Sequence, residues 1–503
     1  MSRLPYISGS VSVPHFIFSG GLNSTAGALS LQDTEASDLQ NVDFDVFGSV
    51  KKRNGYNCLN EAPVAGASTA GGIYWYVTGS TRKAVAVIGN KIYRMDSLGS
   101  GEPDGTWDDI SGTVITITTG ATYPVSWTTF TTAVIGTNDI DAPFKWANSG
   151  SASALTVPTG LTRAKFVTVF QNYCFLANCV VSGVDRPNRF YWSAIKDIGT
   201  WDDADFIEVS PDDGEEITGF KVLGANLIVY KTQGIYSVSF TGDANIPFLV
   251  QKCDSNVGCI APYSIQEVMN GHIFLAFDGI YYFDGNNSYK MSDRLNTLIN
   301  SYQKSRFPYA ISMYQKTKNR YWLAISSAST TINDKIITYD SVSNAFGIYH
   351  NMYPSAMATF LVGGVDERAY FFDYKGYSYW ADNTSAGNDD YPANSKTAID
   401  GYYYTGWKKY EDICSQKSVP HTYVYHQNKD ATLTFAYSYD YSTVDDYTTT
   451  FTTLSTGNVS GLITRRDLNG RGRLIRFKFA NARTSETFQI DGIGAMVKLE
   501  TDV

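Results

Sequence analysis

The chain has 503 residues, of which 14% are aromatic and only 18% are charged, and its formal net charge at pH 7 is −9. This length suits two or three domains, or one large repeat architecture with appendages. The acidic balance argues against a general nucleic-acid-binding protein, which would carry a basic surface. The 36 tyrosines and 43 glycines are typical of pleated strands joined by tight turns, so the composition predicts an all-β fold.

The apolar residues and the cysteines exclude two further classes of protein. No stretch of the sequence approaches the roughly 18 apolar residues of a membrane span, so we expect no membrane segment. Residues 1–5 do not begin a signal peptide, because no charged segment precedes an apolar run there. Six cysteines are too few for a disulfide scaffold in a chain of this length. We therefore expect synthesis in a reducing cytoplasm.

Residues 1–60 are rich in Gly, Ser and Asp and contain few long apolar runs. We expect them to form an extended arm with one short strand. An arm of this kind can add a strand to the last sheet of a ring of sheets, which removes an exposed sheet edge.

Between residues 61 and 396 one hairpin pattern recurs. In its clearest copy, Asn270-Gly271 and Asp278-Gly279 each lie between runs of aromatic and β-branched residues. Asn-Gly and Asp-Gly supply the positive φ angles of two-residue hairpin turns, so this copy predicts three antiparallel strands. The preceding copy carries Ile235-Tyr236 about 45 residues before Ile280-Tyr281. A period of about 40–45 residues is that of a β-propeller blade.

Seven copies of the pattern can be followed by their closing aromatic residues. A single meander cannot bury both of its faces, so the copies must pack on one another. We therefore predict a β-propeller of six or seven blades, because the irregular spacing is compatible with either number. The alternative is a set of unrelated hairpins in a β-sandwich. The closing aromatic residues, about 40 to 58 residues apart, are Tyr93, Trp146, Tyr191, Tyr236, Tyr281, Tyr339 and Trp380.

Beyond residue 396 the pattern changes to short alternating strands with turn residues between them. At least five such strands fit within about 100 residues, which predicts a small β-sandwich-like domain over residues 397–503. The predicted strands are 421–425, 431–437, 447–453, 474–479 and 487–490.

Two charge clusters have several interpretations. Clustered carboxylates can bind calcium or carry out glycoside hydrolysis, or they can line a channel and repel a phosphate backbone. A solvated acidic loop is favoured, since no EF-hand spacing is present. A basic group near the C-terminus suits a solvated face or a subunit interface better than a phosphate contact. The acids are Asp202, Asp203, Asp205, Glu208, Asp212, Asp213, Glu215 and Glu216, and the basic residues are Arg465, Arg466, Arg471, Arg473 and Arg476.

No motif indicates a catalytic centre, a metal or a cofactor, so we expect none of these. The five histidines lack zinc-ligand grouping, and Cys174 with Cys179 and Cys253 with Cys259 lack the Cys-x-x-Cys spacing. Buried free thiols are expected instead. Neither a phosphate-binding loop nor a nucleophile elbow is present. Residues 104–107 (Asp-Gly-Thr-Trp) match only a fragment of a sialidase Asp-box turn, and the fragment is not repeated.

Three groups of segments resemble the tail nozzle proteins of short-tailed bacteriophages, which are also called tail tubular or DNA-stabilisation proteins. The likeness touches both ends and the middle of the chain, and each motif is short and built of common turn residues. The segments are 20–23, 35–43 and 48–56 near the start, 227–241, 257–264 and 270–285 in the middle, and 470–479 with 490–493 near the end.

The resemblance implies a structural virion protein: a β-propeller subunit that forms a homo-oligomeric ring, commonly a hexamer, in the phage tail. The ring would lie beneath the portal and adaptor proteins, with tail fibres or spikes docked nearby. It would retain the packaged DNA and conduct it during ejection without specific binding, after synthesis in the host cytoplasm. The family brings no catalytic residues. The alternative is a glycan-binding or glycan-cleaving β-propeller, receptor-binding or sialidase-like, in which Tyr and Trp form sugar platforms.

Overall fold

The computed structural model describes residues 10–13, 17–45, 48–66, 68–98, 101–112, 117–118, 124–384, 389–410, 413–427, 432–442, 445, 447–452 and 462–499. Within these ranges the strands form nine sheets, and one short α-helix, α1 (Asn296–Ser301), lies between two of them. The all-β prediction is therefore confirmed. Residues 1–5, where we expect no signal peptide, lie outside the described ranges. In the described part of the chain, no helix is long and apolar enough to span a membrane.

Six four-stranded antiparallel sheets follow one another along the chain, and within each sheet the strands pair in sequence order. The first three are β7 (Ala70–Thr78), β8 (Thr81–Ile88), β9 (Lys91–Asp96) and β10 (Asp108–Asp109); β11 (Ser126–Phe130), β12 (Ala133–Thr137), β13 (Phe144–Trp146) and β14 (Ser153–Ala154); β15 (Leu161–Phe170), β16 (Tyr173–Val181), β17 (Val184–Ala194) and β18 (Asp197–Glu208). The next three are β19 (Ile217–Leu223), β20 (Asn226–Lys231), β21 (Ile235–Phe240) and β22 (Phe248–Lys252); β23 (Gln266–Val268), β24 (Gly271–Ala276), β25 (Gly279–Phe283) and β26 (Ser288–Lys290); β27 (Ile311–Gln315), β28 (Arg320–Ile325), β29 (Lys335–Asp340) and β30 (Ala345–Tyr349). These strands cover most of the predicted copies.

The seventh sheet takes one strand from the N-terminal part of the chain. Its strands β31 (Ala356–Val362), β32 (Asp366–Phe372) and β33 (Ser378–Asn383) continue with β6 (Gly55–Cys58), which pairs antiparallel with β33. Tyr56 of β6 holds the strand in place, because its ring lies 5.2 Å from Phe371 and 5.0 Å from Tyr379. Two short strands, β34 (Asp389–Asp390) and β35 (Thr397–Ala398), extend this sheet beyond β6.

The turns of the fifth sheet differ by one residue from the prediction. Val268 pairs with Gly271, so the turn residues are Met269 and Asn270, both with positive φ. Gly271 instead begins β24. A Cβ atom there would lie 2.4 Å from the carbonyl oxygen of Phe283, so this glycine allows close packing rather than a turn.

Two further sheets, of seven and six strands, contain the C-terminal strands, and each also includes strands from the N-terminal 60 residues. We call them the two larger sheets and the preceding seven the smaller sheets, although the seventh also has six strands. They share one core, to which Val424, Phe435, Phe479 and Ile493 belong, and this core continues into the fifth and sixth sheets. One sheet contains β1 (Ser10–Val13), β4 (Val42–Phe44), β5 (Val50–Lys52), β43 (Gln489–Leu499), β37 (Lys417–His426), β40 (Leu462–Asp467) and β41 (Arg471–Gly472); the other contains β2 (Gly21–Leu22), β3 (Glu35–Gln40), β36 (Gly401–Thr405), β42 (Ile475–Asn481), β38 (Thr432–Tyr439) and β39 (Tyr447–Thr452).

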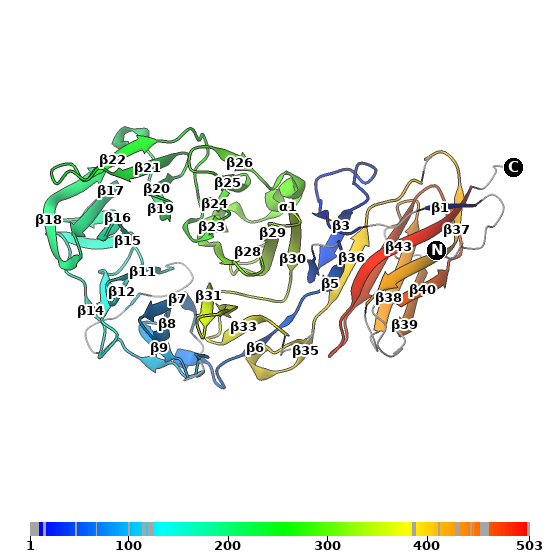
Figure 1. The fold of residues 1–503 in the computed structure, drawn as a ribbon, viewed down its shortest axis with the longest axis horizontal. Coiled ribbons are helices and arrows are strands. Elements are labelled where there is room, and N and C mark those ends of the chain that lie inside the picture. Colours follow the sequence, from blue (N-terminus) through cyan, green and yellow to red (C-terminus); the bar gives the residue numbers. More distant parts are fainter. Residues whose placement is uncertain are drawn as a thin grey trace.

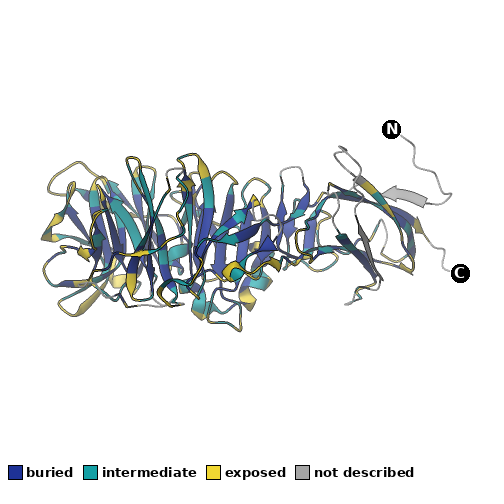
Figure 2. Cartoon of the chain, turned by 90° about the horizontal axis from the view of Figure 1, so that it is seen from below, coloured by how far each residue is buried: buried dark blue, intermediate teal, exposed yellow. Residues whose placement is uncertain are grey.

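The described residues of the N-terminal segment therefore contribute six strands, and the expectation of one short strand is wrong. The chain is elongated, with the smaller sheets at one end and the two larger sheets at the other, as Figure 1 shows. Buried residues run through the strands of both parts, whereas the exposed residues lie mainly in turns and outer edges (Figure 2).

Candidate functional site

One cavity lies among the seven smaller sheets, and we call it the central cavity. Its volume is about 280 Å³, and the first strand of every one of the seven sheets contributes to its lining. Most of these strands contact the next one in chain order, and β31 of the seventh sheet contacts β7 of the first; β19 contacts the 3₁₀ turn Pro262–Ser264, which precedes β23. Figure 1 shows them facing a common centre. All seven sheets therefore contribute to the wall of this cavity.

The wall of the central cavity is mostly aromatic and aliphatic. The rings of Tyr74 and Trp127 stack at 6.3 Å with an interplanar angle of 18°, and Phe166 and Phe220 also contribute to the lining. Among the described lining residues, Lys221 is the only one with a formal charge at neutral pH.

A second pocket, of about 520 Å³, adjoins the central cavity, because both are lined by Pro124, Pro262 and Tyr263. Here the Nζ of Lys165 lies 3.9 Å from a carboxylate oxygen of Asp139 and 3.7 Å from one of Glu216. Burial raises the pKa of Asp139, while Lys165 opposes that shift. Glu216 is thus the one member of the acidic cluster that lines this pocket.

The structure places four of the eight acidic residues on β18, the outermost strand of the third sheet, and none of the eight lines the central cavity. Asp202 and Asp203 are exposed, and each accepts a hydrogen bond from a backbone N–H, at 2.9 and 2.6 Å. Glu208 instead pairs with Arg189 at 2.7 Å. Asp205 is partly buried, and burial raises its pKa.

The remaining acids surround a short 3₁₀ turn, Pro211–Asp213, that follows β18. Both carboxylate oxygens of Asp213 lie 2.6 Å from the Nζ of Lys231, whose side chain is fully buried. Burial acts to raise the pKa of Asp213, but the bonds from Lys231 outweigh it and the pKa lies below its usual value. Asp212 is exposed, and Glu215 accepts the Gln233 N–H at 2.8 Å.

Three of the acids, Glu208, Asp213 and Glu216, are therefore in ion pairs, whereas Asp202, Asp203 and Asp212 are exposed. Over the part of the chain that the structure describes, no three or more His, Cys, Asp or Glu side chains are grouped so as to hold a metal ion. A DNA channel lined by these acids would belong to an assembled ring, and it stays a prediction.

A third pocket, of about 480 Å³, lies beside the seventh sheet and has an aromatic lining, so we call it the aromatic pocket. Tyr353 is 43% exposed, and Tyr379 is buried. Asp373 accepts hydrogen bonds from the Tyr379 hydroxyl at 2.9 Å and from the backbone N–H of Lys375 at 2.8 Å. The aromatic residues that line this pocket are Tyr56, Tyr353, Phe371, Tyr374 and Tyr379.

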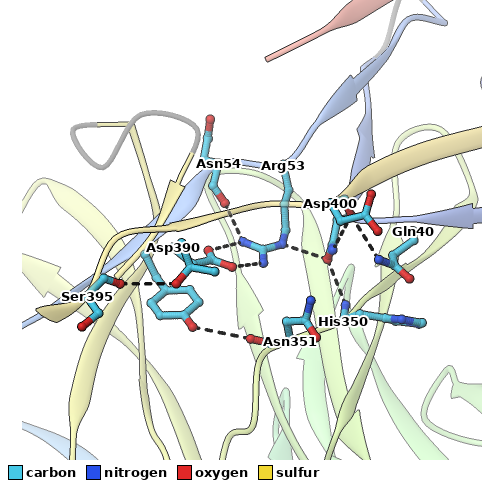
Figure 3. A network of polar contacts seen from close by, with 11 residues as sticks. Gln40, Arg53, Asn54, His350, Asn351, Asp390, Ser395 and Asp400 are labelled. Carbon is cyan, nitrogen blue, oxygen red and sulfur yellow. Dashed lines mark hydrogen bonds and ion pairs between the residues drawn. The ribbon is translucent and has the colours of Figure 1, made fainter. Parts of the chain in front are cut away.

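Asp390, which also lines the aromatic pocket, forms a buried ion pair with Arg53 (Figure 3). The guanidinium donates two hydrogen bonds to the carboxylate, at 2.8 and 2.6 Å, and its Nε donates to the side-chain oxygen of Asn41 at 3.0 Å. The same oxygen accepts the backbone N–H of His350 at 2.9 Å. Burial alone would lower the pKa of Arg53, but Asp390 raises it. The network joins the N-terminal segment to the sixth sheet and to β34.

The cysteines agree with the expectation of buried free thiols. Cys174 and Cys179 lie buried in β16, and Cys253 and Cys259 are buried outside strands. Burial raises the pKa of each of these thiols. Such thiols are poor nucleophiles.

In the C-terminal basic group, Arg465, Arg471 and Arg473 are exposed. Arg465 pairs with Asp467 at 3.0 Å. Arg476 lies 4.6 Å from the ring centre of Tyr404. These contacts suit a solvated face.

No family model and no curated protein matches the chain. Among solved structures, it is similar to the computationally designed Ika8 protein, with 11% identity and a TM-score of 0.38 over 64% of this chain and 99% of that one. It is also similar to PorZ, a bacterial surface component of the type-IX secretion system of Porphyromonas gingivalis, with 11% identity and a TM-score of 0.36 over 70% of this chain and 42% of PorZ. Likeness at this level identifies no family.

Proposed function

We propose that this protein is a structural virion protein that forms a ring in the tail of a short-tailed bacteriophage, where it retains packaged DNA and conducts it during ejection. In this proposal the seven smaller sheets are the blades of a β-propeller, and the two larger sheets form a β-sandwich. The observation that carries the proposal is the succession of four-stranded meanders whose first strands surround one cavity, which is the arrangement of a propeller. The sequence resemblance to tail nozzle proteins supplies the function.

The DNA would pass between subunits rather than through one of them. The central cavity, at about 280 Å³, is smaller than most pockets for drug-sized ligands, which measure about 300–1,000 Å³, so no DNA duplex fits inside it. A cyclic assembly has an opening on its symmetry axis. The proposal therefore requires several copies, and the resemblance favours a hexamer in contact with portal and adaptor proteins and with fibres or spikes.

The physical properties of the chain suit the wall of such a channel. Its N-terminal strands pair with β33, β36 and β43, and these pairings join both ends of the molecule into a stiff unit. The net charge of −9 and the exposed carboxylates of Asp202 and Asp203 would repel DNA phosphates. A repelled duplex has few contacts to break when it moves.

Electron microscopy and native mass spectrometry of the purified protein, together with imaging of phage particles, test the proposal. We expect rings with a central opening, and density for the chain at the tail of the particle. A monomer in solution that is also absent from tail density would overturn the proposal.

The aromatic pocket favours a second candidate, a glycan-binding β-propeller. The accessible rings of Tyr353 and Tyr374 and the carboxylate of Asp373 suit the apolar faces and hydroxyl groups of a sugar. A glycan array distinguishes the two candidates, because the nozzle proposal expects no saturable binding. Binding that is lost in Tyr353→Ala and kept in Tyr289→Ala, a matched exposed tyrosine on β26 outside the pocket, would favour the glycan-binding candidate.

A further inference from the structure

Lys52, at the end of β5, is a buried lysine whose nitrogen faces neutral groups. The residue is 1% exposed. Its Nζ donates to the Oδ1 of Asn481 at 2.8 Å and to the carbonyl oxygen of Arg483 at 3.2 Å. Among the described residues, the carboxylates of Asp389 and Asp390 act on this nitrogen only from beyond ion-pair distance. A buried charge without a close counter-ion is costly, and burial lowers the pKa of Lys52 to about 8.

Two other buried lysines show the usual arrangement. The Nζ of Lys231 lies 2.6 Å from both carboxylate oxygens of Asp213, and Lys408 donates to the carboxylate of Asp33 at 2.8 Å. Each of these ammonium groups is thus paired with a carboxylate. Lys52 faces a carboxamide instead, and with a pKa of about 8, about one side chain in ten is the neutral amine at pH 7. A neutral lysine amine is a nucleophile.

The carboxamide of Asn481, which ends β42 and is 2% exposed, is held by contacts at both of its polar atoms. Its Oδ1 accepts the backbone N–H of Arg483 at 3.2 Å in addition to the lysine nitrogen. Its Nδ2 donates to the carbonyl oxygen of Thr432 at 2.6 Å and to the Oε2 of Glu486 at 3.1 Å. The carbonyl end of this carboxamide therefore lies against an amine, and its nitrogen lies against a carboxyl group.

We propose that Lys52 and Asn481 form an intramolecular isopeptide bond, in which the Nζ of Lys52 bonds to the Cγ of Asn481 and ammonia is released. The neutral amine attacks Cγ, and negative charge develops on Oδ1, where the N–H of Arg483 stabilises it. The bond between Cγ and Nδ2 then breaks. One proton of Nζ is transferred to Nδ2, and Glu486, which is hydrogen-bonded to Nδ2, delivers it as a general acid. An amine and a carboxamide become a secondary amide and ammonia, so no further reactant is consumed.

The bond connects the two larger sheets, because β5 belongs to one of them and β42 to the other. It also joins residues 429 positions apart in the chain. A cross-link that closes so long a loop restricts the unfolded chain strongly, so it holds the N-terminal segment to the C-terminal strands. The bond does not depend on ring formation or on any other part of the proposed function.

Mass spectrometry of the full chain, after incubation of the folded protein at pH 8, tests the bond. We expect an intact mass that is lower than the mass of the sequence by one ammonia molecule. An asparagine that cyclises to a succinimide also loses ammonia, so a tryptic digest is needed as well. The isopeptide bond gives one branched peptide that joins residues 52–53 to residues 479–483. A chain of full mass, or a digest in which peptide 479–483 is free, would overturn the proposal.

Three variants assign the residues. Lys52→Met should have the full mass, and a loss of ammonia that persists in it would come from another asparagine and overturn the assignment. Glu486→Gln keeps an acceptor for the Nδ2 of Asn481 but removes the acid, so the branched peptide should form at least about a hundredfold more slowly. An unchanged rate would overturn the role of Glu486. Lys408→Met, at a buried lysine that is paired with a carboxylate, should form the branched peptide as the parent does.

Discussion

The buried ion pair between Arg53 and Asp390 should control the local stability of the junction between the seventh sheet and the N-terminal segment. Their side chains are only 2% and 5% exposed, and Arg53 makes two hydrogen bonds to Asp390 and one to Asn41. Arg53→Met leaves the Asp390 carboxylate buried without its cation. Removing one partner of a buried pair typically costs about 3–5 kcal/mol.

Hydrogen–deuterium exchange measures this cost locally. Peptides that cover 50–58 and 389–398 should exchange more than about a hundredfold faster in Arg53→Met, since 1.4 kcal/mol corresponds to a factor of about ten. Peptides of the second sheet should be unchanged. Arg465→Met is the matched control, because its ion pair with Asp467 is exposed, with side chains 54% and 75% accessible, and such pairs contribute about 0–1 kcal/mol.

A double variant separates the electrostatic contribution of the ion pair from the contribution of its packing. Arg53→Met with Asp390→Leu removes both charges and leaves an apolar contact, so it should recover most of the loss, because the remaining cost is that of packing. The reasoning would be refuted if Arg53→Met exchanged at the rate of the parent protein, or if the double variant exchanged faster than Arg53→Met.

Three further predictions concern other parts of the protein. Burial lowers the pKa of His272 to about 4. Neutral His272 therefore stabilises the folded state fully above pH 6.5, and up to about 3 kcal/mol of this stability is lost as the pH falls to 4. Denaturant titrations of the parent and of His272→Gln at pH 7 and 4.5 check this, and the free energy of unfolding should fall more in the parent. Gly271→Ala places a Cβ 2.5 Å from the ring of Tyr282 and should cost about 1–3 kcal/mol, measured as a lower Tm, whereas Gly27→Ala, with no atom nearer than 3.9 Å, should be neutral. Of the six thiols, exposed Cys414 should react with a thiol reagent in the native protein, and the four buried ones only after unfolding.

Local signals in the sequence predict the repeated hairpins well, because turn residues and strand periodicity are properties of short segments. The one-residue error at Gly271 shows the limit of such signals. A glycine next to an asparagine is typical of a turn, yet here the glycine is required because Tyr282 and Phe283 approach it closely. Only the packing of the neighbouring strand distinguishes these two uses of glycine.

Long-range pairing is not visible in the sequence in this way. β3 and β36 are joined by pairs such as Leu39 with Tyr403, and no periodicity in either segment points to the other. Prediction of the candidate site from the sequence is limited for the same reason. Lys221 and Trp127 are unremarkable in their own strands, and only the arrangement of seven sheets brings both to one cavity. The acidic residues, by contrast, are conspicuous in the sequence, yet only half of them lie on one strand, the edge strand β18.

The pairing of the chain ends has a consequence for folding and assembly. β6 lies between β33 and β34 in the seventh sheet, and β1 to β5 belong to the two larger sheets, so all three sheets depend on contacts between residues several hundred positions apart. Loop closure on this scale is slow compared with hairpin formation. Until the N-terminal segment docks, β33 and β43 present unpaired edges, which are sites of aggregation. Docking of the N-terminal segment therefore covers the edges of β33 and β43, and the buried Arg53–Asp390 pair lies beside β6, where this segment joins the seventh sheet.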